Sequence, residues 1–373
     1  MRTPKILLIK PPLDDHDRPI YDLIVPLRKA GIDPIWTGLQ QPWSQIVKTA
    51  LEEDADAIGV SVHTGDPAIL LGKLKTELER AGLSEKILVA GGSGEITLPD
   101  MQAKLAGLGY KVFLSGDAVE NIGAYIMEKF RENQKCSVSI TEHFESRLSR
   151  HLLAKHITRL ENINLTLVPP PKKKSFRVLL AGPAGAGKSS LLNKILEKLE
   201  LREIKIGVML CDPRGPKEKG AFLGDRVWMQ ERTLSENIFI RSFSQLSNYS
   251  RRSVNFLKKV SDLFALWGAD ITFLETIGMG QESAARLGEL ADLFIWVALP
   301  NETDSMRLMK GGAHELADLV LLNKIDKEPS FKAELALKQH FQNPYFKVSA
   351  HTGEGIDEVC EFILEKIKNN PCG

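Results

Sequence analysis

The first third of the chain alternates short apolar runs with longer stretches in which apolar residues recur at spacings of three and four. The runs span residues 5–10, 33–38, 57–61, 87–92 and 111–116. Near-continuous apolar strands that alternate with helices are typical of a parallel sheet covered on both faces. We therefore expect residues 1–131 to form a doubly wound α/β domain that binds ligands beyond the carboxyl ends of its strands.

The alternation stops between residues 132 and 175. Residues 150–163 keep a helical spacing with one polar face, and the three consecutive prolines at 169–171 cannot continue a helix. We interpret 132–175 as a linker that contains connecting helices.

From residue 176 to residue 373 the alternation of strands and helices resumes. The predicted strands are 176–181, 205–212, 270–275, 293–299, 319–324 and 345–350. The pattern again indicates a parallel sheet between helices, so the fold class is α/β with two doubly wound domains.

Composition narrows the class of protein. A chain of 373 residues is too long for one hydrophobic core of ordinary size, so two domains are expected. A content of 43% hydrophobic and 26% charged residues excludes a disordered or fibrous protein. The net charge of +1 offers no field for nucleic acid or anionic lipid, and no apolar segment approaches the roughly 20 residues of a membrane span. Four cysteines without paired spacing suit a reducing compartment. We expect a cytoplasmic protein that binds neither nucleic acid nor membrane.

The strongest motif is GPAGAGKSS at residues 182–190, which fits the phosphate-binding loop G-x-x-x-x-G-K-[ST] between a predicted strand and a predicted helix. Glycines let backbone N–H groups approach phosphate oxygens, the lysine reaches the outer phosphates, and the hydroxyl after it can bind Mg²⁺. The predicted phosphate-binding residues are Gly182, Gly185, Gly187, Lys188, Ser189 and Ser190.

Two further motifs follow strands later in the chain. NKID at 323–326 and SA at 349–350 resemble the guanine-reading loops of G proteins. By that resemblance Asp326 pairs with the two donors of the base and Asn323 ties the loops together. The predicted nucleotide contacts here are Asn323, Lys324, Asp326, Ser349 and Ala350, and they favour GTP or GDP over ATP.

The stretch LETIGMGQES at 274–283 departs from the D-x-x-G of ordinary G proteins. Together with CDPRG at 211–215, LGDR at 223–226 and KGGAHELAD at 310–318, it resembles the G-protein chaperones of cobalamin-dependent acyl-CoA mutases. The resemblance implies a magnesium site formed by Ser189, Asp212, Asp225 and Glu275. It also makes Lys188, Glu275 and Gln281 the catalytic candidates for GTP hydrolysis.

Near the N-terminus, DDHDRP at 14–19 resembles the D-x-H-x-x-G signature of flavodoxin-like cobalamin-binding domains. The resemblance implies that His16 ligates cobalt, with Asp14 and Lys10 behind it, and that Ser61, Gly91 and Gly92 line a slot for the displaced nucleotide tail. Two positions depart from the family pattern. Pro19 replaces the glycine, and His63 replaces the aliphatic residue of S-x-L; the remaining histidines are interpreted as surface or capping residues.

These resemblances imply a cobalamin-binding subunit fused to its GTPase chaperone, with adenosylcobalamin, GTP or GDP, and Mg²⁺ as cofactors. A mutase also needs a barrel of roughly 250 residues, for which this chain has no room. We therefore expect a separate acyl-CoA mutase large subunit as partner. Chaperones of this family carry a C-terminal dimerisation extension after the G domain, whereas this chain ends at Gly373, one helix beyond Ser349–Ala350. We therefore leave a homo-oligomer open, as we do contact with a cobalamin adenosyltransferase.

Two alternatives stay open at this point. A regulatory GTPase could use residues 1–131 as a docking domain without a corrinoid, which Pro19 and His63 would permit. A corrinoid methyl-transfer protein would also carry a cobalamin fold, although such proteins place a helical bundle before it and this sequence starts with a strand.

Overall fold

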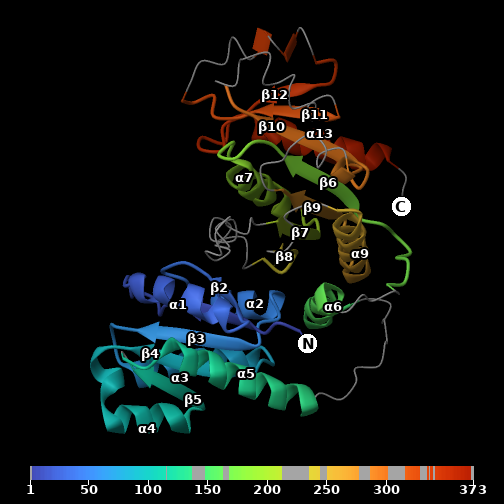
Figure 1. Ribbon diagram of the computed structural model, residues 1–373. Helices are drawn as coiled ribbons and strands as arrows, with labels where there is room; N and C mark the ends of the chain where they lie inside the picture. The colour runs from blue at the N-terminus through green and yellow to red at the C-terminus, as the bar shows by residue number, and fades with distance from the viewer. Residues whose placement is uncertain are drawn as a thin grey trace. The chain divides into compact units, whose positions relative to one another are not determined.

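The computed structural model describes residues 2–114, 116–136, 148–162, 168–211, 235–243, 250–276, 286–300, 316–327, 334–335, 337–338 and 341–370. The described residues cluster into two compact units (Figure 1). The first contains 2–136 and 150–162, and the second contains 148–149 and everything described from 168 onward. The domain borders placed at 131 and 175 stay predictions.

The sheet of the first unit has five parallel strands in the order β2-β1-β3-β4-β5. This order is one of the two common doubly wound arrangements, and its switch point lies between β1 and β3. The predicted strands are confirmed to within two residues at each end. They are β1 (Lys5–Ile9), β2 (Asp33–Trp36), β3 (Ala57–Val62), β4 (Ile87–Gly92) and β5 (Tyr110–Leu114).

Helices cover both faces of this sheet. One face packs against α1 (Arg18–Lys29) and α5 (Val119–Cys136), and the core there includes Ile6, Leu8, Leu27 and Ile126. The other face packs against three helices and buries Leu7, Ile58, Leu74 and Leu105, among others. Those helices are α2 (Trp43–Glu52), α3 (Pro67–Arg80) and α4 (Pro99–Gly107).

Helix α6 (Arg150–Asn162) forms where the sequence predicts a connecting helix, and it lies against α2 of the first unit. Arg150 pairs with Glu52 of α2. The prediction that His156 is a surface or capping residue is wrong, since only 4% of it is exposed. It lies at helical spacing from the buried Leu153 and Leu160, on the stripe that the helix turns inward.

The sheet of the second unit has seven parallel strands in the order β12-β11-β10-β6-β9-β7-β8. Six were predicted: β6 (Phe176–Ala181), β7 (Ile206–Cys211), β9 (Ile271–Glu275), β10 (Leu293–Ala298), β11 (Leu319–Leu322) and β12 (Tyr345–Lys347). Its described long helices are α7 (Lys188–Glu200), α9 (Arg251–Trp267) and α13 (Ile356–Asn369).

The edge strand β8 (Ile238–Phe243) was missed by the sequence analysis. Arg241 and Ser242 interrupt its apolar run, yet both are buried, at 0% and 4% exposure. Polar residues inside a short run remove the signal by which a buried strand is recognised. Among the described helices, none combines the length and the apolar character needed to cross a bilayer.

Candidate functional site

The loop after β1 is organised around the fully buried carboxylate of Asp14. One oxygen, Oδ1, accepts the backbone N–H of His16 at 3.2 Å and lies 3.0 Å from His16 Nδ1. The other oxygen accepts the backbone N–H of His63 at 2.7 Å and lies 3.5 Å from Lys10 Nζ. Three of the predicted cofactor residues, Lys10, Asp14 and His16, therefore meet in one cluster.

The charge of this cluster is set by burial and by its hydrogen bonds. Burial alone would raise the pKa of Asp14, but the hydrogen bonds from His63 and His16 and the charge of Lys10 outweigh it and lower the pKa. Burial lowers the pKa of Lys10, against the attraction of Asp14. Asp14 is thus an ionised carboxylate behind the imidazole of His16.

His16 has the geometry of a single imidazole metal ligand. Its Nδ1 faces Asp14, which leaves Nε2 on the far side of the ring, and 57% of the side chain is exposed. A carboxylate behind a histidine fixes its tautomer and strengthens it as a donor to a metal. In the part of the chain that the structure describes, Asp14, Asp15 and His16 form the one group of three metal-ligating residues with ligand atoms within 4.8 Å of one another.

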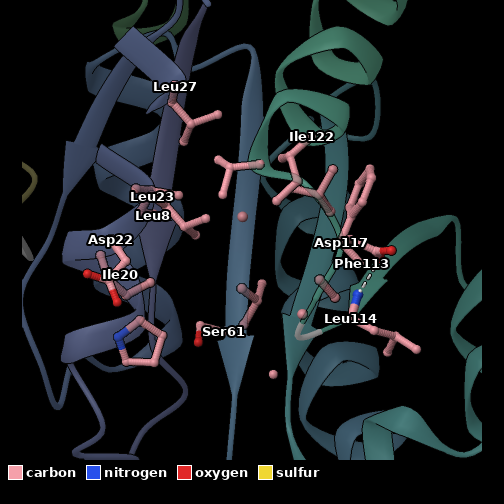
Figure 2. A pocket seen from close by; sticks show the side chains of 18 of the residues that line it. Leu8, Ile20, Asp22, Leu23, Leu27, Ser61, Phe113, Leu114, Asp117 and Ile122 are labelled. Atoms are coloured by element: carbon pink, nitrogen blue, oxygen red, sulfur yellow. Dashed lines mark hydrogen bonds between the residues drawn. The ribbon is translucent and has the colours of Figure 1, made fainter. Parts of the chain in front are cut away.

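A cavity of about 380 Å³ lies between α1, α5 and the sheet of the first unit (Figure 2). Gly59 in β3 lines this space, and a Cβ there would lie 3.1 Å from both Ile6 Cδ1 and Leu8 Cδ2, so a larger residue would displace side chains of the cavity wall. The predicted slot residues Ser61, Gly91 and Gly92 all line the cavity.

Gly92 cannot be replaced without moving the backbone. Its φ is +147°, and a Cβ there would lie 1.8 Å from the carbonyl oxygen of Val62. Glycine alone tolerates that combination. The close approach of β4 to β3 that shapes this wall therefore depends on Gly92.

The cavity has one polar end. The parallel strands place Ser61 and His63 at the carboxyl edge of the sheet. Arg18 and Asp22, from the first turns of α1, line the same end of the cavity. Leu27, about two and a half turns along α1, lies toward the opposite end, as Figure 2 shows. A ligand that enters from the carboxyl edge would meet polar groups first and an apolar floor afterwards.

The sequence analysis gave His63 no role, but the structure connects it to the site. Its Nδ1 lies 2.7 Å from Ser93 Oγ, its Nε2 lies 3.2 Å from Ser61 Oγ, and its ring centroid is 5.4 Å from that of His16. Burial and the charge of Lys10 lower the pKa of His63. Ser93 was also missed; its position directly after the glycine pair that ends β4 was the available signal.

In the second unit the phosphate-binding loop connects β6 to α7. Gly182 and Gly187 have φ of +153° and +86°, and a Cβ would lie 2.3 Å from Val297 O at the first and 2.5 Å from Asn323 Nδ2 at the second. Lys188 is 8% exposed, and its Nζ donates to the carbonyl of Gly182 at 3.2 Å and that of Pro183 at 3.0 Å. Gly185, with φ of +78°, has open space around its Cα.

Ser189 and Glu275 bring two oxygen ligands together. The Ser189 hydroxyl donates to Glu275 Oε1 at 2.6 Å, and Glu275 ends β9, which pairs with β6. A hydroxyl and a carboxylate are the hard oxygen donors that Mg²⁺ prefers, so the pair fits that ion. Ser190 is exposed in the first turn of α7. The other residues predicted for this end, Asp212, Asp225 and Gln281, lie outside the described residues.

The first predicted base-reading loop contacts both the phosphate-binding loop and the second base-reading loop. Asn323 donates from Nδ2 to Ala186 O at 2.8 Å and accepts the N–H of Ala350 at 3.2 Å. Lys324 Nζ donates to the carbonyl of Gly185 at 2.7 Å.

The carboxylate of Asp326 is held in place by the neighbouring loop. Ser349 Oγ donates to Asp326 Oδ1 at 2.7 Å, and this hydrogen bond lowers the pKa of Asp326. An ionised carboxylate with one oxygen fixed can accept the two N–H donors on the edge of guanine.

Comparisons with known proteins agree with this second site. The family model described as "Methylmalonyl Co-A mutase-associated GTPase MeaB" matches residues 148–370. A putative GTPase of Pyrococcus horikoshii is 32% identical over 241 residues, which are 59% of this chain and 74% of that protein.

Longer relatives match more of the chain. A fused isobutyryl-CoA mutase of Cupriavidus metallidurans is 30% identical over 334 residues, which are 84% of this chain and 30% of that protein. A fused isobutyryl-CoA mutase of Nocardia farcinica is 27% identical over 94% of this chain and 35% of its own length. This chain thus spans about a third of the fused mutases. A crystal structure of LAO/AO transport system kinase superposes with a TM-score of 0.43 and 20% identity, over 58% of this chain and 70% of that one.

Proposed function

The chain belongs to the MeaB family of methylmalonyl-CoA mutase-associated GTPases, and on that premise we propose that it is a GTPase chaperone with a cobalamin-binding domain of its own. In this proposal it loads or protects adenosylcobalamin for a separate acyl-CoA mutase large subunit. The observation that carries the proposal is the Asp14–His16 pair beside an open cavity of about 380 Å³ in the first unit.

The extent of the matches supports a shared origin of both units with mutase proteins. The family model covers residues 148–370, whereas the match to the Nocardia farcinica fused mutase covers 94% of this chain. That longer match must include most of the first unit. These longer relatives are named as fused mutases. The names favour a corrinoid-binding role for the first unit over a role in docking another protein.

The residues of the first unit fit a flavodoxin-like cobalamin-binding role. His16 Nε2 would face the cobalt, Asp14 would fix the ring, and Lys10 would balance the charge of Asp14. The cavity beside Ser61 would take the displaced nucleotide tail. Bound adenosylcobalamin supplies the carbon–cobalt bond from which mutase radical chemistry starts.

The residues of the second unit fit Mg²⁺ and GTP. Ser189 and Glu275 would hold the ion, the loop from Gly182 to Lys188 would bind the phosphates, and Asp326 would read the base. Asp212 and Asp225 are proposed as further magnesium ligands and Gln281 as a catalytic residue, all on family resemblance.

The partner is proposed as an acyl-CoA mutase large subunit. The fused relatives carry their mutase in the same polypeptide by name, so a separate chain could provide the corresponding part here. Contact with a cobalamin adenosyltransferase and formation of a homo-oligomer belong to the same proposal.

The test is an ultraviolet-visible titration of the full chain with adenosylcobalamin. We expect saturation with the spectral shift that marks replacement of the cofactor's own base by histidine, and we expect His16→Ala to lose that shift. Asp100→Ala is the control, since Asp100 is exposed in the first turn of α4, which packs on the face of the sheet away from the cavity. A shift that survives in His16→Ala would refute cobalt ligation by this residue, while GTP turnover measured on the same sample reports whether the second unit is intact.

A further inference from the structure

Helix α6 belongs to one part of the chain by sequence and to the other by structure. The match to the GTPase family model begins at residue 148, directly before this helix, and continues to residue 370. In the structure, residues 150–162 nevertheless cluster with the first unit, whereas residues 148–149 and those described from 168 onward belong to the second. The chain therefore enters the first unit for the length of this one helix and then returns to the second unit.

The apolar stripe of α6 is buried. Leu153, Ile157 and Leu160 recur at spacings of four and three, which places them on one side of the helix, and they are 0%, 0% and 7% exposed. The helix lies against α2 of the first unit. A short helix in a protein owes most of its stability to the packing of such an apolar face, so α6 depends on the surface that covers it.

An ion pair fixes each end of α6 to the first unit. At the first residue of the helix, Arg150 Nη1 lies 2.5 Å from Oε1 of Glu52, whose side chain is fully buried in α2. In the last turn, Glu161 Oε2 lies 3.0 Å from Nζ of Lys5, the first residue of β1. The side chains of Lys5 and Glu161 are 10% and 18% exposed, so salt and water screen their attraction only in part. The two pairs together define the direction in which the helix lies on this surface.

The signs of these charges oppose the dipole of the helix. A helix favours negative side chains at its N-terminus and positive ones at its C-terminus. Arg159 in the last turn follows this rule. Arg150 at the first residue and Glu161 in the last turn break it, and each would destabilise the isolated helix. Their partners in the first unit account for both positions, which marks these two charges as docking contacts.

We propose that α6 is a docking helix by which the GTPase part of the chain, residues 148–370, holds the first unit. The surface that receives it is formed by α2 and by the start of β1. That surface fits a helix with an apolar stripe, a positive N-terminal end and a negative C-terminal end. The inference goes beyond the proposed function, because it holds whether or not the first unit binds a corrinoid.

The experiment cuts the folded full chain on one side of α6 or on the other. One variant carries a site for a specific protease within residues 137–147, and the other carries it within residues 163–167. After the first cut α6 remains joined to the second unit, and we expect the two fragments to elute together in size-exclusion chromatography at about 1 μM. After the second cut α6 remains joined to the first unit, and we expect the fragments to separate.

Either of two results would overturn the proposal. Separation after the first cut would mean that α6 does not hold the first unit. Co-elution after the second cut would mean that contacts other than those of α6 hold the fragments together. Thermal melting of each uncut variant beside the unmodified protein shows whether the fold is intact, and a site that lowers the melting temperature is moved within its range.

A charge exchange tests the ion pair of the last turn in the chain cut within 137–147. Glu161→Lys places two positive side chains together, so we expect the dissociation constant of the fragments to rise about tenfold or more. Adding Lys5→Glu should restore most of the affinity. Lys155→Glu is the matched control, because it reverses a charge of α6 that has no ion pair among the described residues. Equal dissociation constants for Glu161→Lys and the unchanged chain would overturn the role of this pair in docking.

Discussion

Residue by residue, the first unit holds its buried acids near basic partners. Asp56 accepts the backbone N–H of Lys5 at 2.9 Å and contacts the guanidinium of Arg2. Burial nevertheless raises its pKa to about 6. The loss of hydration therefore outweighs the partners at this position, unlike at Asp14, where several donors converge on the carboxylate.

The raised pKa of Asp56 predicts a pH-dependent stability of the first unit. The ordinary pKa of 3.8 applies in the unfolded chain, so the folded state binds a proton between pH 3.8 and about 6 that the unfolded state lacks. The contribution is complete below 3.8 and is lost as the pH rises through 6.

We expect the free energy of unfolding to fall by on the order of 2 kcal/mol from this group between pH 4 and pH 7. Chemical denaturation of Asp56→Asn at several pH values should remove that part of the slope. Asp100→Asn, which removes an exposed carboxylate of the same unit, is the control. An Asp56→Asn variant with the wild-type slope would contradict the assignment.

Several residues of the site could be predicted from the sequence because they belong to one short motif. Lys10, Asp14 and His16 lie within seven positions, and the structure brings them together. The contact of His63 with Ser93 joins residues 30 positions apart. It depends on the register of β3 against β4, which no local pattern encodes.

At the scale of elements, continuous apolar runs predicted the strands, and the strand whose run contains polar residues was missed. The five strands of the first unit and six of the second were predicted, while β8 was hidden by Arg241 and Ser242. The order of the strands in each sheet could not be predicted from the sequence either. Periodicity indicates which segments are strands but not which strands are neighbours.

Strand β3 carries the next prediction, because its one glycine shapes the cavity. In Gly59→Val the new Cβ alone would lie 3.1 Å from Ile6 Cδ1 and from Leu8 Cδ2 and 3.3 Å from Val89 Cγ2, closer than ordinary van der Waals contact, so these side chains of the cavity wall would have to shift. We expect the affinity for adenosylcobalamin to fall by at least about tenfold, with a loss of about 1–3 kcal/mol in stability from overpacking. GTP turnover should not change.

Gly72→Val is the matched control for this substitution. Gly72 lies in α3 of the same unit, and a Cβ there would have Leu108 Cδ1 as its nearest neighbour, at 3.9 Å. Spectroscopic titration of both variants gives the comparison. Equal affinities in Gly59→Val and wild type would show that the tail does not occupy this cavity.

On the scale of the whole molecule, two units with separate sheets should respond to different ligands. A ligand at 100 times its dissociation constant stabilises the state that binds it by about 2.7 kcal/mol. We expect GTP with Mg²⁺ to raise the thermal transition of the second unit and adenosylcobalamin to raise that of the first.

Differential scanning calorimetry with each ligand alone, and again after removal of Mg²⁺ with a chelator, measures this separation. The chelator should cancel the effect of GTP and leave that of adenosylcobalamin. If one ligand moved both transitions equally, the units would unfold as one body, and the division seen in the fold would not extend to stability.

Asn323 has a consequence for the rate at which nucleotide leaves. One side chain bonds to the phosphate-binding loop through Ala186 and to the base-reading loop through Ala350. The two ends of a nucleotide would therefore be held by loops that open together, so release becomes a single slow event instead of two independent fast ones. Among variants of one interface, differences in affinity usually appear in dissociation, so we expect Asn323 to lengthen the residence time of a bound nucleotide.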